Sequence, residues 1–233
     1  MKLSILIPVF NEVTTITTVI HAVEKATIPN GWQREIIVVD DYSTDGTREV
    51  LAKIKTHKII FHDKNQGKGM AIRTALESST GDVFLIQDAD LEYDPSEYPA
   101  LLTCILNGAD VVYGTRFKMM KLKLFGPHKT RLPLHYFGNR FLTLLTNVLY
   151  GSSISDMETG YKVFTKRVVQ NLRLRARRFD FEPEITAKIL KQKFTIVEVP
   201  IHFHARKFNE GKKITWRDGF KAAWYLFRYR IMD

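Results

Sequence analysis

The segment Asp88-Ala89-Asp90-Leu91-Glu92 carries three acidic side chains at a spacing of two, directly after the apolar run 83–86. In an extended segment this spacing points side chains to the same side, so the three carboxylates are expected to converge. Converging carboxylates repel one another unless a cation lies between them. Mg²⁺ is commonly held by one or two carboxylates together with substrate phosphates, and Mn²⁺ takes the same oxygen ligands. The segment therefore predicts a divalent metal site, with a strand end and an acidic helix cap at Asp94 as the alternative.

Strands and helices that would position these acids alternate along the first half of the chain. Apolar runs predict strands at 3–9, 35–39, 58–61, 83–86 and 110–114, and helical periodicity predicts helices between them. This alternation is typical of an α/β fold with a mostly parallel central sheet flanked by helices. In such sheets the ligand lies beyond the carboxyl ends of the strands, near a topological switch point.

Polar segments follow four of the five predicted strands. They are 8–12, Asp40-Asp41, 88–90 and Gly114-Thr115-Arg116. Because the carboxyl ends of parallel strands lie on one rim, these segments together predict a nucleotide site. Gly67-Lys68-Gly69 lacks the spacing of a P-loop or of a dinucleotide fingerprint, so its glycines are expected to permit a tight start of the next helix, with Lys68 a candidate charge for the nucleotide.

Composition limits the class of protein and its partners. The 233 residues are 45% hydrophobic and 26% charged, which is ordinary for a globular protein and excludes disorder. The excess of 35 Lys and Arg over 25 Asp and Glu implies an anionic partner, either nucleic acid, an anionic membrane surface or a phosphorylated small molecule.

The single cysteine, Cys104, rules out an intrachain disulfide and favours a cytoplasmic protein. No window approaches the roughly 18 apolar residues of a membrane span, so membrane association is expected to be peripheral.

Taken together, the motifs resemble family 2 of the inverting GT-A glycosyltransferases, and within it the dolichyl- or polyprenyl-phosphate sugar synthases. The segments that carry the resemblance are 8–12, 39–47, 65–71, 88–95, 114–116, 156–164 and 198–200. The resemblance implies the GT-A nucleotide-diphospho-sugar transferase fold in a single catalytic domain, 1–233. Its parts would be a nucleotide-sugar-binding half, 1–116, an acceptor-binding half, 117–205, and a basic amphipathic segment, 206–233.

The resemblance also implies a donor site. The implied nucleotide-sugar-binding residues are Pro8, Val9, Phe10, Glu12, Asp40, Asp41, Lys68, Asp88, Ala89, Asp90, Arg206, Lys212 and Lys213. Asp88 and Asp90 stand in the family's D-x-D motif and would hold Mg²⁺ or Mn²⁺ against the donor diphosphate. Glu92 stands where dolichyl-phosphate mannose synthases carry a metal-contacting Gln, and it is the third candidate ligand. A metal with Arg or Lys would neutralise the charge that builds on the leaving nucleoside diphosphate.

An acceptor region is predicted from 116 to 140, which is basic and aromatic and contains no acid. Such a segment suits anionic lipid headgroups, and the alternative is a solvated basic loop before a core helix at 134–150. The resemblance implies an acceptor loop and a membrane-interface helix here, with Arg116, Arg131 and Asn139 as acceptor-binding candidates. A phosphate acceptor needs no general base, because a phosphomonoester with a second pKa near ~6 is already an oxyanion at neutral pH. Asp156 would then orient other groups or bind a cation.

The C-terminal segment predicts an amphipathic helix. Its apolar face consists of Trp216, Phe220, Ala223, Trp224, Phe227 and Ile231. Docking of this face onto the domain is the expectation, and binding in a membrane interface is the alternative. Many relatives append transmembrane helices after this segment, whereas this sequence ends at Asp233. It is therefore expected to use the cytoplasmic face of a membrane or a membrane partner subunit.

The resulting functional hypothesis is a metal-dependent transfer of a hexose from a nucleotide sugar to dolichyl or polyprenyl phosphate. GDP-mannose and UDP-glucose are the favoured donors, ahead of UDP-N-acetylhexosamine, and the catalytic candidates are Asp88, Asp90, Arg116, Arg131 and Asp156. The alternative is a saccharide or polysaccharide hydroxyl acceptor with Asp156 as general base. A nucleic-acid-binding module would explain the positive charge but not acids at strand ends, which would repel phosphates, so nucleic acid is not an expected partner.

Overall fold

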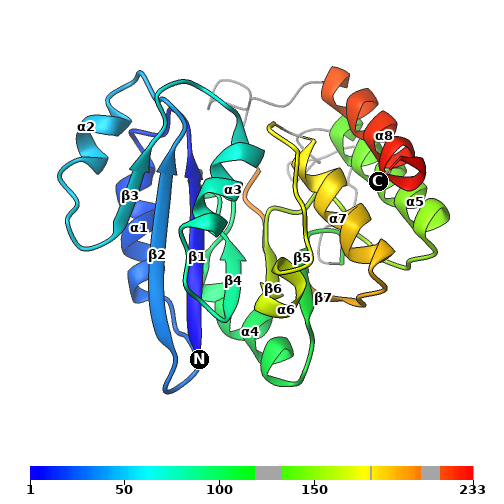
Figure 1. Cartoon of the computed structure of the whole chain (residues 1–233), viewed down its shortest axis with the longest axis horizontal. Helices are drawn as coiled ribbons and strands as arrows, with labels where there is room; N and C mark the ends of the chain where they lie inside the picture. Colours follow the sequence, from blue (N-terminus) through cyan, green and yellow to red (C-terminus); the bar gives the residue numbers. More distant parts are fainter. Residues whose placement is uncertain (119–132, 179, 206–215, 233) are drawn as a thin grey trace, which may run out of the picture.

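The computed structural model describes residues 1–118, 133–178, 180–205 and 216–232. Within these ranges seven strands form one sheet in the order β3-β2-β1-β4-β6-β5-β7 (Figure 1). The strands are β1 (Lys2–Val9), β2 (Gln33–Asp40), β3 (Lys58–Phe61), β4 (Val83–Ile86), β5 (Val111–Thr115), β6 (Lys162–Thr165) and β7 (Ile196–Pro200). The five strands predicted from the first half of the chain are thereby confirmed.

The sheet is mostly parallel, as the alternation of elements predicted. β1 pairs in parallel with β2 and β4, β2 pairs in parallel with β3, and β5 pairs in parallel with β7. The chain runs from β1 through β2 to β3 at one edge and then returns to place β4 on the other side of β1. The carboxyl ends of β1 and β4 therefore flank a topological switch point, where ligands bind in such sheets.

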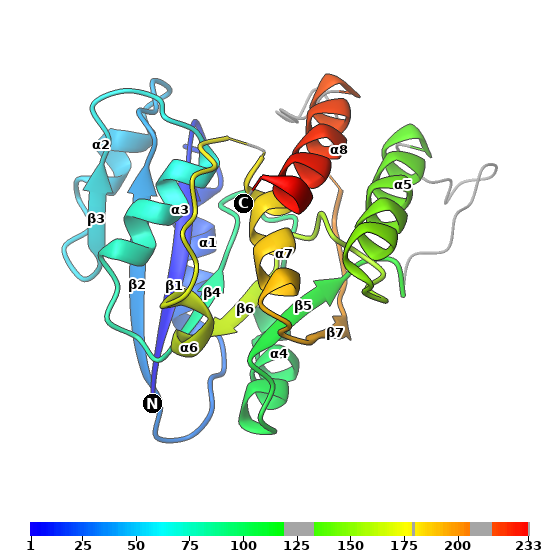
Figure 2. The ribbon, with the colours of Figure 1, turned by 45° about the vertical axis from the view of Figure 1, so that its right-hand side comes forward.

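Helices cover both faces of the sheet (Figures 1 and 2). Their bounds are α1 (Ile16–Lys25), α2 (Thr47–Leu51), α3 (Lys68–Glu77), η1 (Pro95–Glu97), α4 (Tyr98–Leu106), α5 (Pro133–Tyr150), α6 (Lys166–Val169), α7 (Phe181–Lys191) and α8 (Trp216–Ile231). Apolar side chains of α1, α2 and α4 pack on one face with Leu3, Ile5 and Ile7, whereas those of α3 and α7 pack on the other. Because β1 is buried on both sides, it reads as a continuous apolar run.

β6 was not predicted as a strand. It lies between β4 and β5 and runs antiparallel to both. The strand is four residues long and begins with Lys162, a charged residue that hides the strand pattern. Lys162 is nevertheless buried, because its Nζ donates to the carbonyl oxygens of Met157 and Thr159 and lies 4.7 Å from the centroid of the Tyr113 ring. Strands from both halves of the chain thus share one sheet.

The prediction for the apolar face of α8 is wrong. α8 lies beside α5 (Figures 1 and 2), and it docks through Ala222 and Leu226, which are buried with Leu142 of α5. The face expected to dock instead points to solvent: Phe220, Trp224 and Ile231 are 73%, 67% and 78% exposed. The helix therefore has two apolar stripes, and the narrower one with small residues packs closely. Within the described ranges, no helix has the length and apolarity needed to cross a bilayer.

Candidate functional site

The acidic segment after β4 is a turn and not an extension of the strand. β4 ends at Ile86, Leu91 has a left-handed φ of 59°, and the backbone N–H of Glu92 donates to Oδ1 of Asp90 at 3.1 Å. The expectation that alternation in an extended segment would align the three acids is therefore wrong. In the part of the chain that the structure describes, no group of three or more His, Cys, Asp or Glu side chains could hold a metal ion.

A lysine joins this turn to helix α7. Nζ of Lys68, the first residue of α3, lies 2.8 Å from Oδ1 of Asp88 and 3.0 Å from Oε1 of Glu182. Burial opposes the charge on Lys68, but the two carboxylates outweigh it and hold the pKa of Lys68 above its ordinary value. Sequence reasoning placed Lys68 near the nucleotide and missed Glu182, because only the tertiary structure brings α7 to the end of β4.

The start of α3 depends on the predicted tight turn. Gly67 has φ of 95°, and a Cβ there would collide with the carbonyl oxygen of Arg177. That carbonyl also accepts the backbone N–H of Met70 at 3.1 Å. Since an L side chain rarely adopts this φ and no space exists for one, glycine is required to present Lys68 to Asp88.

A buried glutamine fixes the backbone of the acidic turn. Oε1 of Gln87 accepts the hydroxyls of Tyr98 and Tyr161, both at 2.8 Å, and its Nε2 donates to the carbonyl oxygens of Asp88 and Tyr93 at 3.0 and 3.3 Å. Gln87 and the three tyrosines are buried, whereas Asp88 is half-buried. Gln87 gives no chemical signal in the sequence, yet its four hydrogen bonds determine how the neighbouring Asp88 is presented.

Gly160 allows the second half of the chain to approach the acids. Its backbone N–H donates to the Tyr93 hydroxyl at 2.8 Å, and a Cβ at this position would collide with Oδ2 of Asp88. The conformation needs no unusual φ, so the requirement for glycine is one of space. The segment 156–160, identified by its motif, therefore lies directly against the acidic turn.

Two adjacent acids, the last residue of β2 and the residue after it, have different surroundings. Asp41 accepts the backbone N–H groups of Gln66 and Gly67 at 2.8 and 2.6 Å, and His62 Nδ1 lies 2.8 Å from it. Asp40 is fully buried: its Oδ2 accepts the Ser43 N–H and pairs with Arg48 at 3.2 Å, while its Oδ1 has no hydrogen-bond partner. Asp41 thus organises the loop before Lys68, and Asp40 keeps an acceptor for a further donor.

Left-handed backbone occurs after three parallel strands of this rim. Asn11, Tyr42 and Leu91 have φ of 53°, 67° and 59° and follow β1, β2 and β4. Such conformations cost about 1–3 kcal/mol each for non-glycine residues and concentrate at functional sites. Hydrogen bonds hold the loops together, since the Asn11 N–H donates to Ser43 Oγ and Oδ1 of Asn11 accepts the Thr44 N–H, both at 2.8 Å.

A second acid–cation pair lies after β5. Arg116 donates from Nε and Nη2 to the two oxygens of Asp156, both at 2.7 Å, and its backbone N–H also donates to Oδ2 at 3.0 Å. Arg116 packs against the Phe203 ring at 5.1 Å. Glu198 of β7 holds the partner loop, accepting the N–H groups of Ser155 and Asp156 at 2.7 and 3.1 Å. Both residues of the pair are buried, and three hydrogen bonds join them.

The remaining predicted residues lie in three places. Pro8 and Val9 end β1, Phe10 and Glu12 follow it, and the carbonyl oxygen of Ala89 accepts the Thr15 hydroxyl at 2.8 Å. Asn139 lies on α5, half-buried. Arg131, Arg206, Lys212 and Lys213 lie outside the described residues. The predicted residues at or just after the ends of β1, β2 and β4 are called the strand-end set: 8–10, 12, 40–41 and 88–90. Lys68 lies with this set because it pairs with Asp88.

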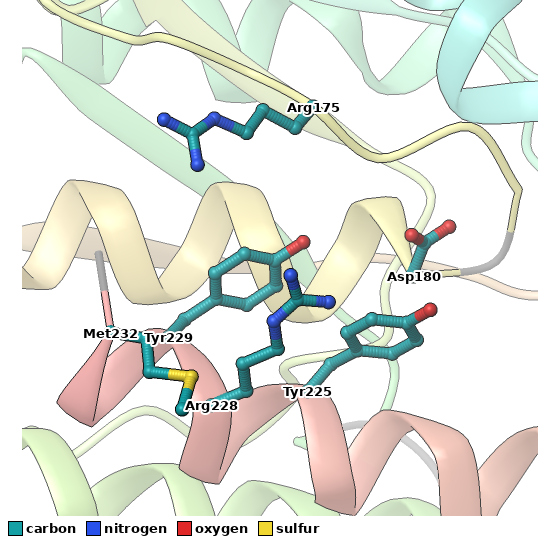
Figure 3. Close-up of a pocket in the computed structure, with 6 residues that line it drawn as sticks. All are labelled: Arg175, Asp180, Tyr225, Arg228, Tyr229 and Met232. Carbon is teal, nitrogen blue, oxygen red and sulfur yellow. The ribbon is translucent and has the colours of Figure 1, made fainter.

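A pocket of about 200 Å³ lies elsewhere, between α8 and the segment before α7 (Figure 3). It is lined by Arg175, Asp180, Tyr225, Arg228, Tyr229 and Met232. None of these residues belongs to the strand-end set, so this pocket is distinct from the site described above.

In mostly parallel α/β sheets, ligands bind beyond the carboxyl ends of the strands at a topological switch point, and in this chain the acids and the strained loops lie there. The sequence model of glycosyl transferase family 2 matches residues 4–173. This chain belongs to that family, and the resemblance noted in the sequence is confirmed.

The relatives extend the comparison. The chain is 31% identical over 226 residues to the low-salt glycan biosynthesis hexosyltransferase Agl6 of Haloferax volcanii, covering 96% of this chain and 52% of that protein. It is 30% identical to the dolichol-phosphate mannosyltransferase of Pyrococcus furiosus, covering 91% and 59%. It is 28% identical to the undecaprenyl-phosphate 4-deoxy-4-formamido-L-arabinose transferase of Salmonella paratyphi B, covering 91% and 62%. The chain spans less than two thirds of each of these relatives.

Solved structures confirm the GT-A fold. Glucosyl-3-phosphoglycerate synthase from Mycobacterium tuberculosis, in complex with Mn²⁺, UDP and phosphoglyceric acid, is similar with a TM-score of 0.73 at 19% identity, covering 100% of this chain and 79% of that one. The same enzyme has also been solved with Mg²⁺ and UDP. At this level of identity the similarity concerns the fold.

The donor set of this chain fits a divalent cation. Asp88 and Asp90 are half-buried carboxylates, hard oxygen ligands at the switch point, and Asp88 already pairs with a cation of the protein itself. One or two carboxylates with substrate phosphates suffice for Mg²⁺, so a third acid is not required.

Proposed function

We propose that this chain is a metal-dependent inverting glycosyltransferase that moves a hexose from a nucleotide sugar, GDP-mannose or UDP-glucose, to dolichyl or polyprenyl phosphate. The observation that carries the proposal is the Arg116–Asp156 pair. A hydroxyl acceptor needs a general base with a free oxygen, whereas both oxygens of Asp156 accept from Arg116. A phosphate acceptor needs no such base. Two relatives are named for a dolichol phosphate and an undecaprenyl phosphate, which supports this acceptor class.

In the proposed reaction an acceptor phosphate oxygen attacks the anomeric carbon of the sugar. The bond from that carbon to the donor diphosphate breaks, its electron pair leaves with the nucleoside diphosphate, and the configuration inverts. Asp88 and Asp90 would hold a divalent ion, which supplies charge neutralisation to the leaving group when bound. Lys68, which pairs with Asp88, and Arg116, which follows β5, would hold phosphate oxygens.

Asp40, at the end of β2, is a candidate contact for the base of the nucleotide. Its buried Oδ1 has no partner in the protein. Uracil and guanine each present a ring N–H that can donate to such an acceptor, so the donor base would satisfy it. This geometry fits either favoured donor.

Two apolar stripes support a membrane surface as the place of reaction. α5 exposes Phe137, Phe141, Leu144 and Val148, and α8 exposes Phe220, Trp224, Phe227 and Ile231. Each set has the spacing i, i+4, i+7, i+11, which makes one continuous stripe on a helix. The helices lie side by side, and Arg140, Arg228 and Arg230 are exposed on them. Apolar stripes with flanking cations suit the interface of an anionic bilayer, where a polyprenyl phosphate presents its headgroup.

The test is a transfer assay with labelled GDP-mannose or UDP-glucose, polyprenyl phosphate and Mn²⁺, followed by extraction into organic solvent. The proposal expects label in the organic phase that depends on metal and on the lipid phosphate. Label that stays in water and requires a saccharide acceptor would replace it with the hydroxyl-directed reaction, in which Asp156 acts as base.

A further inference from the structure

The pocket between α8 and the segment before α7 has a basic lining that the proposed reaction does not use. Its volume is about 200 Å³, and its charged lining residues are Arg175, Asp180 and Arg228. Figure 3 shows Arg175 coming from the segment before α7 and Arg228 coming from α8, so the two guanidinium groups reach the pocket from different elements. Both arginines are exposed, and the pocket is therefore accessible from solvent.

The chemistry of this lining suits a phosphodiester. Arginine forks bind phosphate oxygens through paired hydrogen bonds, and the hydroxyls of Tyr225 and Tyr229, whose rings stack at 5.9 Å, can donate as well. Asp180 accepts the backbone N–H of Arg178 at 2.8 Å and so fixes the end of the segment that carries Arg175. Two arginines and one aspartate give the lining a net charge of +1. The single negative charge of a phosphodiester balances it, whereas the second charge of a phosphomonoester would face Asp180.

The pocket borders the exposed apolar stripe of α8. The stripe and the pocket use adjacent positions of the helix, which are Trp224 and Tyr225, Phe227 and Arg228, and Ile231 and Met232. Successive residues of an α-helix are about 100° apart, so the pocket lies on the side of α8 next to the stripe. A phosphate in the pocket therefore has apolar surface beside it for attached acyl chains, which favours a lipid over a free phosphate.

We propose that this pocket binds the phosphodiester headgroup of an anionic phospholipid and fixes the orientation of α8 on the bilayer. Arg175 and Arg228 hold the phosphate oxygens, while the acyl chains stay in the bilayer that the α8 stripe enters. The segment 173–178 has four exposed arginines and no acid, and its positive potential attracts anionic lipid. This lipid is distinct from the acceptor of the proposed reaction, which is a phosphomonoester. The inference goes beyond the proposed function, because binding needs neither a donor nor transfer.

Cosedimentation of the full chain with vesicles tests the pocket. Vesicles of phosphatidylcholine alone are compared with vesicles that also contain phosphatidylglycerol, in buffer without donor or metal. Loss of one cation near an anionic bilayer is expected to weaken binding about fivefold through charge alone. Arg175→Gln and Arg228→Gln should each weaken binding to the phosphatidylglycerol vesicles about 30-fold, because a charge-assisted hydrogen bond to the phosphate is lost as well.

Matched controls make the same change of charge outside the pocket. Arg173→Gln lies in the same segment as Arg175, and Arg230→Gln lies on the same helix as Arg228; both side chains are exposed, and neither lines the pocket. Each control should show only the fivefold loss. Circular dichroism confirms that every variant is folded. Equal losses in the pocket variants and the controls would overturn the proposal.

Calorimetry with the wild type identifies the source of the phosphate without any variant. The probes are dihexanoyl phosphatidylglycerol below its micelle concentration, its deacylated headgroup glycerophosphoglycerol, and inorganic phosphate. The lipid should bind at least about tenfold more tightly than either soluble probe, because its acyl chains contact the apolar stripe. A headgroup that binds as tightly as the lipid would mean a soluble phosphodiester ligand and would overturn the lipid assignment.

These outcomes are separable from those of the transfer assay. Vesicle binding that depends on Arg175 and Arg228, with no transfer of label to lipid, would reject the proposed function and keep this inference. Transfer of label, with equal vesicle binding by the pocket and control variants, would do the reverse.

Discussion

The Lys68–Asp88 and Arg116–Asp156 pairs use the same kinds of charge in different settings. Lys68 makes single contacts to two carboxylates, and both it and Asp88 are partly exposed. Arg116 makes a bidentate contact to Asp156, which is fully buried. A lysine ammonium is a compact point charge that can exchange partners, whereas a guanidinium fork fixes geometry. The first pair is suited to give way to a ligand, and the second to hold a loop in place.

The largest change in stability is expected when the Arg116–Asp156 pair is broken. Asp156→Asn leaves the buried Arg116 charge without its anion, and removal of one partner of a buried pair costs about 3–5 kcal/mol. Urea unfolding should show a fall in the free energy of unfolding of that size. A variant as stable as the wild type would contradict the structural role that we give to Asp156.

Breaking the Lys68–Asp88 pair should change ligand binding much more than stability. Asp88→Asn leaves Lys68 paired with Glu182, so we expect the free energy of unfolding to change by less than about 1 kcal/mol. Affinity for a nucleoside diphosphate in Mn²⁺ should fall at least about 100-fold, because a carboxylate that holds the metal is lost. Calorimetry with and without Mn²⁺ measures this; unchanged metal-dependent binding would remove Asp88 from the metal site.

A third test concerns the exposed stripe of α8. Trp224→Ala should weaken binding to anionic phosphatidylglycerol vesicles roughly tenfold, because a large apolar side chain no longer enters the interface. Its stability should stay within about 0.5 kcal/mol of the wild type, since the side chain is 67% exposed. Leu106→Ala, another exposed apolar position at the end of α4, is the matched control for cosedimentation. If Trp224→Ala and Leu106→Ala lose the same affinity for the vesicles, the α8 stripe is not the membrane-binding surface.

The smallest expected effect uses an acid outside the site. Burial would raise the pKa of Glu35, but hydrogen bonds from Ser4, Thr80 and Lys2 outweigh it and lower the pKa from 4.5 to about 2. The stability that these bonds give is complete above pH 4.5 and is lost as the pH falls toward 2. Glu35→Gln should flatten the acid side of the stability curve in thermal melts and leave transfer unchanged. A curve as steep as that of the wild type would assign the acid sensitivity to another group.

Local pattern was sufficient for most of the sheet. The strands of the first half follow continuous apolar runs that any parallel sheet buried on both faces requires. Polar residues at their ends then had to lie on one rim, and Asp40, Asp41 and Asp88 are found there. These conclusions needed only the chemistry of neighbouring residues and the general geometry of parallel sheets.

The sequence by itself therefore determined the fold class, the rim on which the acids lie and the glycine turn before Lys68. The tertiary structure alone decided that Asp88 to Glu92 form a turn, that Glu182 joins Lys68, and that α8 docks through Ala222 and Leu226. Each of these depends on contacts between segments far apart in the chain. An amphipathic helix with two apolar stripes has no local signal for which stripe is buried, because the partner surface of α5 and α7 makes that choice.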